Sequence, residues 1–137
     1  MGQQQLLLII LGVIIVGIAV AVGITMFQDN AVDQNRSAVI ADLTTLAAKS
    51  QQYYAKPTTL GGGGNSFSGL SADGTGLGIL ASTAFTTNAN GTYSIKVAGG
   101  ATSVTLQGIG TTALSDGSKP TYTMLVTAQT QAPTKVN

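Results

Sequence analysis

Few side chains in this sequence are suited to catalysis, and the clearest pair is Lys49 and Ser50. A lysine amine can activate a serine hydroxyl for nucleophilic attack when the two groups lie within hydrogen-bonding distance. These residues are adjacent in a segment predicted to be helical, so their side chains point about 100° apart. That geometry favours a solvated helix face over a catalytic dyad, and we expect no catalytic residues.

Two patterns are similar to parts of metal-binding loops. Asp73 and Asp116 each precede a glycine, and Asn88-x-Asn90-Gly91 is similar to the start of a calcium loop. A calcium loop of that type ends with a glutamate, and the chain has no Glu. We therefore expect turns at these positions, with no metal ion and no cofactor.

The composition as a whole argues against chemistry. The 137 residues include no His, Cys or Trp, and the net charge is +1. The absence of His, Cys and Glu removes the commonest general bases, thiol nucleophiles and metal ligands. A nearly neutral chain also lacks the basic patch typical of nucleic-acid binding. We expect no enzymatic activity, no nucleic-acid partner and no small-molecule substrate.

The most informative stretch runs from Leu6 to Ile24, where every residue is Leu, Ile, Val, Ala or Gly. As a helix rising about 1.5 Å per residue, it would span roughly the ~30 Å hydrocarbon layer of a bilayer. A signal peptide would begin with basic residues, but the first cation is Arg36. A plain membrane anchor would carry Lys or Arg on one flank, and neither flank has them. The third interpretation is the first half of a longer structural helix.

Apolar residues continue at helical spacing after this run, which supports the third interpretation. The stripe consists of Val32, Val39, Leu43, Leu46 and Ser50 to Tyr53. No proline interrupts the segment before Pro57. We therefore expect one helix from about residue 2 to about residue 55, roughly 80 Å long. Its first half is apolar on all sides and must be buried in lipid or among other helices.

A glycine-rich segment follows the predicted helix. Residues 57–77 are expected to form a connecting loop that lets the chain leave the helix and begin a sheet. Gly61 to Gly64 are followed by Asn65 instead of the Gly-Lys-Ser/Thr ending of a phosphate loop. We expect no phosphate site there.

Alternating residues predict a small antiparallel sheet in the last part of the chain. The expected strands are 92–97, 103–107 and 121–126, with 78–83 as a candidate extra edge strand. The side chains expected to face inward are Tyr93, Ile95, Val97, Val104, Leu106, Tyr122, Met124 and Val126. A turn at Asn90-Gly91 and a hairpin loop at 98–102 would connect the strands. So thin a sheet needs the stripe of the helix to complete its core.

This order of elements resembles the type IV pilins and the related pseudopilins, most specifically over residues 1–56. In that family an apolar N-terminal helix continues as an amphipathic stalk against a small antiparallel sheet. The resemblance implies an α+β, lollipop-shaped fold with four parts. These are an apolar helix (1–27), a stalk helix (28–56), a connecting loop (57–77) and a head with three to four strands (78–137). It also implies a structural subunit, a major pilin.

The resemblance implies where the subunits would meet. The family usually has Glu at the fifth mature position; with Met1 as the expected first mature residue, that position is Gln5. A neutral amide can form a hydrogen bond there but no ion pair. The residues expected to form subunit contacts are Gln5, Leu6, Leu7, Leu8, Ile9, Ile10, Leu11, Ile14, Ile15, Ile18, Val22 and Phe27.

Two further features of the sequence have open interpretations. Gly12, Gly17 and Gly23 each weaken a helix by about 1 kcal/mol relative to Ala, so they serve either close helix packing or local unwinding. Asn35 and Asn90 begin Asn-x-Ser/Thr patterns and are candidate glycosylation sites.

The partners implied by the resemblance are identical copies in a helical extracellular filament. Before assembly they are the cytoplasmic membrane, a prepilin peptidase that removes a leader, and the assembly machinery. Two alternatives stay open. One is a minor pseudopilin of a secretion machine, and the other is an adhesion module that remains a monomer anchored in the membrane.

Overall fold

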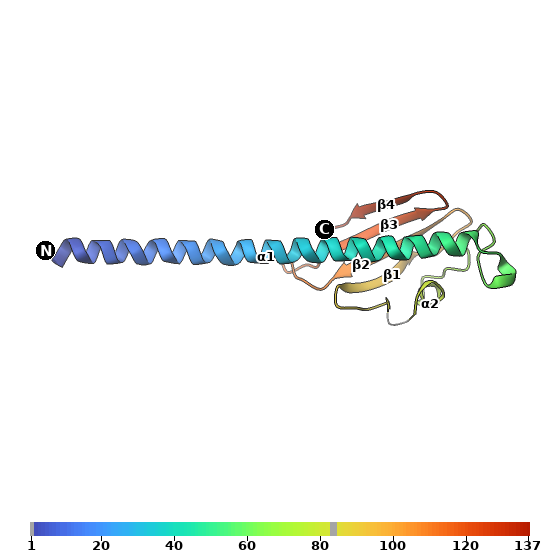
Figure 1. The fold of residues 1–137 in the computed structure, drawn as a ribbon, viewed down its shortest axis with the longest axis horizontal. Helices are drawn as coiled ribbons and strands as arrows, with labels where there is room; N and C mark the ends of the chain where they lie inside the picture. The colour runs from blue at the N-terminus through green and yellow to red at the C-terminus, as the bar shows by residue number, and fades with distance from the viewer. Residues whose placement is uncertain (1, 83–84) are drawn as a thin grey trace.

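One long helix and a four-stranded sheet make up the fold (Figure 1). The computed structural model describes residues 2–82 and 85–137. Helix α1 (Gly2–Ala55) has 54 residues, and the sheet packs on its C-terminal half alone. The predicted α+β fold, with an apolar helix that continues into a stalk, is confirmed.

Helix α1 ends just before Pro57, as the sequence predicts. Pro57 lies two residues beyond Ala55 and lacks the amide hydrogen that a further helical turn needs. The glycine-rich loop then folds back over the helix end. Gly63 N donates a hydrogen bond to Tyr53 O at 2.7 Å, and Asn65 N donates to Tyr54 O at 2.7 Å. These bonds satisfy carbonyls that the end of a helix leaves without partners.

The segment after this loop differs from the prediction. Residues 78–83 were expected to add an edge strand, but helix α2 (Thr75–Leu80) occupies the first three of them, and Thr83 lies outside the described residues. Leu77 and Leu80 are three positions apart, and both are buried. That spacing places both side chains on one face of a helix, whereas a strand would separate them. A short 3-10 helix, η1 (Thr58–Leu60), lies within the connecting loop.

The sheet is an antiparallel meander with the order β1-β2-β3-β4. Its strands are β1 (Gly91–Val97), β2 (Ser103–Gly110), β3 (Thr121–Thr127) and β4 (Gln131–Lys135). The prediction of three to four antiparallel strands is confirmed, but the fourth strand comes from the C-terminus. Strand β4 lies at the edge and contains Pro133, a residue that edge strands tolerate.

Val97 faces away from the core, contrary to the prediction. Its side chain is 56% exposed, whereas Tyr93 and Ile95 on the same strand are buried. The pairing of β1 with β2 shifts between Ile95 and Val97, since Ile95 pairs with Leu106 and Val97 pairs with Thr105. An irregularity of this kind breaks the alternation of side chains across a strand.

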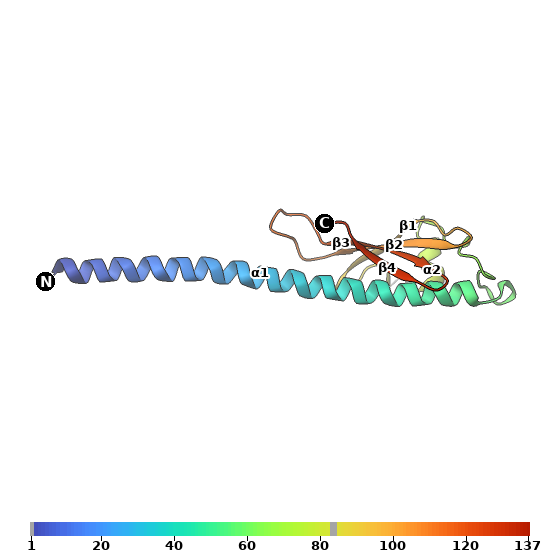
Figure 2. The same cartoon turned by 90° about the horizontal axis from the view of Figure 1, so that it is seen from above.

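The core lies between the stalk half of α1 and one face of the sheet (Figure 2). Its fully buried helix residues are Val39, Leu43, Leu46 and Ala47. Close approach depends on β2: a Cβ at Gly108 would lie 2.8 Å from Val39 Cγ1 and 3.0 Å from Tyr93 Cε1. Glycine at this position therefore lets the helix lie directly on the strand.

Candidate subunit-assembly surface

The first half of α1 projects beyond the sheet, and no other element among the described residues covers it (Figure 1). Every residue from Gly2 to Asn30 is exposed. The large apolar side chains between Leu6 and Phe27 are 51% to 77% exposed. Contiguous apolar surface on this scale marks an interaction site with protein or membrane. Among the described residues, α1 is the one helix long and apolar enough to cross a bilayer.

All the residues predicted to form subunit contacts lie on this projecting half. They cover every side of the helix, because the run from Leu6 to Ile24 has no polar residue. Gln5 is exposed near the free end. Gly12, Gly17 and Gly23 lie within the unbroken helix, and a Cβ on any of them would meet nothing within 4 Å. The helix is therefore continuous at these glycines, and its surface there is open to a neighbour.

Three polar residues of the stalk hold the head against the helix, and the first is Asn35. Its Nδ2 donates a hydrogen bond to Asn90 O at 2.7 Å, and its Oδ1 accepts one from Thr111 N at 3.1 Å. Asn35 is 8% exposed. One side chain thus joins the loops before β1 and after β2 to the helix.

The second is Asp42, which fixes the loop before β1. Its Oδ2 accepts hydrogen bonds from Tyr93 Oη at 2.6 Å and from Nδ2 of Asn88 and of Asn90, each at 3.0 Å. Burial raises the pKa of Asp42, but these three bonds outweigh it and hold the pKa below its usual value. Burial and the neighbouring carboxylate raise the pKa of Tyr93. The Asn88-x-Asn90-Gly91 pattern therefore serves the contact between loop and stalk.

The third is Gln51, which fixes the turn between β3 and β4. Its Nε2 donates to Thr127 O at 3.0 Å, and its Oε1 accepts a hydrogen bond from Gln131 Nε2 at 3.1 Å. Asn35, Asp42 and Gln51 together define how far along α1 the head sits.

The two candidate glycosylation sites do not present free amides. Asn35 Nδ2 and Asn90 Nδ2 both donate hydrogen bonds inside the domain, to Asn90 O and Asp42 Oδ2. Asn35 is also buried within a helix. A glycan on either nitrogen would break a contact that holds the head to the stalk, so the folded structure argues against both sites.

The residues considered above for catalysis or metal binding have structural roles in the fold. Ser50 is fully buried and its Oγ donates to Leu46 O at 2.9 Å, while Lys49 lines a surface cavity. Asp73 Oδ1 accepts hydrogen bonds from the Ser71 and Thr75 hydroxyls and from Thr75 N, which lower the pKa of Asp73 to about 2. Among residues 2–82 and 85–137, no cluster of three His, Cys, Asp or Glu side chains is placed to hold a metal ion.

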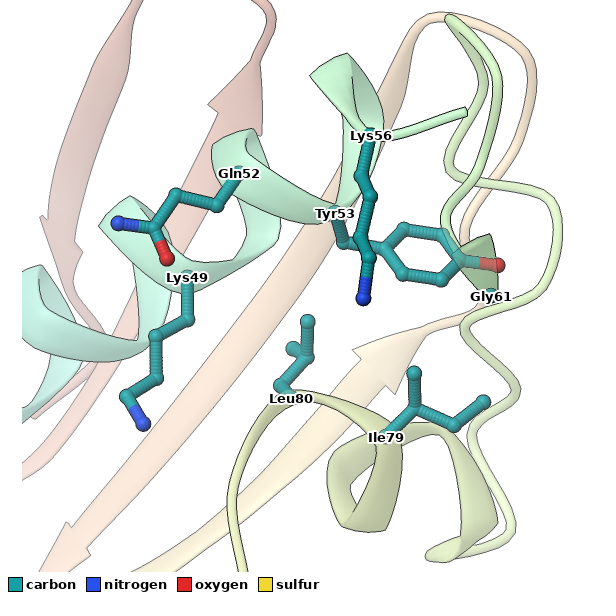
Figure 3. Close-up of a pocket in the computed structure, with 7 residues that line it drawn as sticks. All are labelled: Lys49, Gln52, Tyr53, Lys56, Gly61, Ile79 and Leu80. Atoms are coloured by element: carbon teal, nitrogen blue, oxygen red, sulfur yellow. The ribbon is translucent and has the colours of Figure 1, made fainter. Parts of the chain in front are cut away.

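A cavity of about 180 Å³ lies at the far end of the stalk, between α1, the connecting loop and α2 (Figure 3). Lys49, Gln52, Tyr53 and Lys56 line it from the helix. The ammonium groups of Lys49 and Lys56 extend from the same side of α1 (Figure 3). Within the described residues, neither takes part in an ion pair. The cavity therefore carries two positive charges that no carboxylate of the described residues pairs with.

A second cavity, of about 340 Å³, lies where the helix leaves the head. Asp29, Val32, Asp33 and Arg36 line it from α1, and Leu114 and Ser115 line it from the loop between β2 and β3. Asp33 Oδ1 lies 3.1 Å from Arg36 Nη1, and the Asp33 side chain is 70% exposed. Neither cavity could be predicted from the sequence, because each is lined by a loop whose position depends on the folded sheet.

No known protein-family model matches the sequence, and neither a curated protein nor a solved structure is significantly similar to it.

Proposed function

We propose that this chain is the structural subunit of a helical extracellular filament of the type IV pilus kind. The observation that carries the proposal is the rigid continuity of α1. One unbroken helix has 16 apolar residues and three glycines from Leu6 to Ile24, and one face of its other half is buried against the head. Copies of such a chain can bury their apolar halves against one another and leave the heads outside.

The shape of the subunit supports an open polymer. The projecting half exposes apolar side chains on every side, and the head covers one side of the stalk alone. When two different surfaces of identical copies bind each other, the contact can repeat from copy to copy. If each copy is also displaced along an axis, the repeat does not close into a ring and produces a fibre. The membrane would hold the same apolar half before assembly, since its length matches the hydrocarbon layer.

The lateral contacts are tested best by a change that a bilayer tolerates and a helix bundle does not. Gly12→Leu and Gly17→Leu add apolar volume, so membrane insertion should be unchanged. Between close-packed helices the same side chains would force the backbones apart. We expect electron microscopy of the sheared extracellular fraction to find filaments for the wild type and few or none for these variants. Val13→Leu, which changes volume little, is the control and should form filaments.

The alternatives give different results in the same experiment. A monomeric membrane-anchored adhesion module would give single particles in detergent and no filaments from the wild type. A minor pseudopilin would be a trace component of the sheared material, whereas a major subunit would dominate it. Loss of membrane insertion in the glycine variants would contradict the stated reason for their effect.

A further inference from the structure

Two pairs of opposite charge lie at the two ends of the stalk. Lys49 and Lys56 face the cavity beside α2, and neither is in an ion pair among the described residues. Asp29 and Asp33 line the cavity at the other end, where Arg36 pairs with Asp33 and leaves the Asp33 side chain 70% exposed. Each pair therefore has charge that the subunit itself does not neutralise.

The two pairs also lie on opposite sides of the helix. At about 100° per residue, the direction of the aspartate pair differs from that of the lysine pair by roughly 170°. Their midpoints are about 32 Å apart along the axis. Contacts of the helix with the head show where these two sides lie. The lysine pair is on the side of Asp42, which binds the loop before β1. The aspartate pair is on the side of Gln51, which binds the turn between β3 and β4. The charged pairs thus lie on the two flanks of the subunit.

We propose that Lys49 and Lys56 of one copy bind Asp29 and Asp33 of the next copy, and that this contact sets the axial offset between neighbours in the filament. The inference rests on the proposed function and adds the register of assembly to it. Opposite charges on opposite flanks allow the same contact to repeat without closure. Ion pairs between exposed side chains contribute modest affinity, and their main effect is orientation and the rejection of wrong registers.

The same offset brings matching surfaces together elsewhere on the two helices. With copies displaced by about 32 Å, the aspartate flank of the second copy lies beside the lysine flank of the first at the level of residues 31–45. The residues of that aspartate flank are Leu11, Ile15, Ile18 and Val22. The facing residues include the small Ala31, Ala38 and Thr45, together with Asp42, whose carboxylate is bound to the head. Small residues permit close approach of exposed apolar side chains from a neighbour.

A zero-length carbodiimide tests the contact directly, because it joins a carboxylate to an amine that touches it. Within one subunit the nearest members of the two pairs, Asp33 and Lys49, are separated by about 24 Å of helix and cannot be joined. We expect mass spectrometry of treated, sheared filaments to identify peptides that link Asp29 or Asp33 to Lys49 or Lys56. The same subunits dispersed in detergent should lack the link. Intact wild-type filaments without it would overturn the inference and leave the proposed function standing.

Charge exchange provides the second measurement. The double variant Lys49→Glu/Lys56→Glu should lower the filament yield by about tenfold or more, because acidic groups would then face each other. Adding Asp29→Lys/Asp33→Lys should restore the yield. The control Lys96→Glu/Lys135→Glu makes the same change in net charge at exposed sites on the sheet and should form filaments normally.

Three other results would each contradict the proposed contact between copies, and each points to a different cause. Normal yield from Lys49→Glu/Lys56→Glu, with an unchanged melting temperature, excludes the contact. If the wild type binds inorganic phosphate and loses it in that variant while filaments persist, the cavity is an anion site unrelated to assembly. Absence of wild-type filaments would remove the proposed function together with the register.

Discussion

Asp42 Oδ2 on the stalk helix lies 2.6 Å from Tyr93 Oη on strand β1, and the tyrosine is 2% exposed. The carboxylate is the acceptor for the hydroxyl of an almost fully buried side chain. The same oxygen accepts hydrogen bonds from the side-chain amides of Asn88 and Asn90, in the loop before β1. The contact therefore couples the helix, the first strand and its preceding loop through a single atom.

Removal of this acceptor should destabilise the head. Asp42→Ala leaves a buried tyrosine hydroxyl without a partner, so we expect a loss of about 2 kcal/mol in the free energy of unfolding. Urea unfolding of the full chain in detergent, followed by circular dichroism, measures it. The control is Asp33→Ala, which breaks an exposed ion pair with Arg36 and should cost at most about 0.5 kcal/mol. Equal losses in the two variants would contradict the role of Asp42.

The same contact predicts a dependence on acid. Because the pKa of Asp42 is lowered in the folded state, its contribution is complete above the ordinary value of 3.8 and is lost as the pH falls through the folded value. The wild-type melting temperature should therefore drop as the pH falls below about 4. Asp42→Asn should be less stable at neutral pH and should lose less on acidification. Parallel curves for both proteins would exclude Asp42 as a source of the acid sensitivity.

The close contact between helix and sheet predicts a steric effect at Gly108. Gly108→Ala places a methyl group against Val39 and the Tyr93 ring, and such overpacking should cost about 1–3 kcal/mol. Gly78→Ala provides a control of opposite sign. A Cβ at Gly78 in α2 meets nothing within 4 Å, and alanine is the better helix former by up to about 1 kcal/mol. Thermal unfolding of both variants measures the difference, and a Gly108→Ala protein as stable as the wild type would refute it.

Shortening a buried apolar side chain of the stalk should lower the free energy of unfolding. Leu43 is fully buried between the helix and the sheet, so Leu43→Ala is expected to cost about 2–5 kcal/mol. Leu125→Ala removes the same atoms from a side chain that is 46% exposed and should cost much less. Denaturant midpoints of the two variants provide the comparison. A small effect of Leu43→Ala would mean that the head is not held by the helix stripe.

Periodicity was sufficient to predict the helix and most of the sheet, because long runs of regular spacing have one consistent explanation. Val32, Val39, Leu43 and Leu46 recur as one helical face, and all are buried in the structure. The alternating residues of β2 and β3 were likewise placed correctly. Prediction failed where tertiary contacts decide the outcome.

The short segment of α2 illustrates that failure. The six residues after Gly74, two of which are glycines, fit either a strand or a helical turn, and burial of Leu77 and Leu80 in the core decides for the helix. The outward position of Val97 follows from a shift in strand pairing, which no local pattern encodes. The polar contacts of Asn35, Asp42 and Gln51 join positions 46 to 80 residues apart in the chain, and no local pattern in the sequence indicates them.

The contacts of Asn35, Asp42 and Gln51 are spread over 16 residues of helix, about 24 Å. Tension applied to the projecting half of α1 would run along the helix axis, parallel to the interface with the sheet. The head would then be loaded in shear, with all three anchoring points and the apolar core sharing the force at once. A head held in this way resists being peeled from its own stalk, as the proposed filament would require under mechanical load.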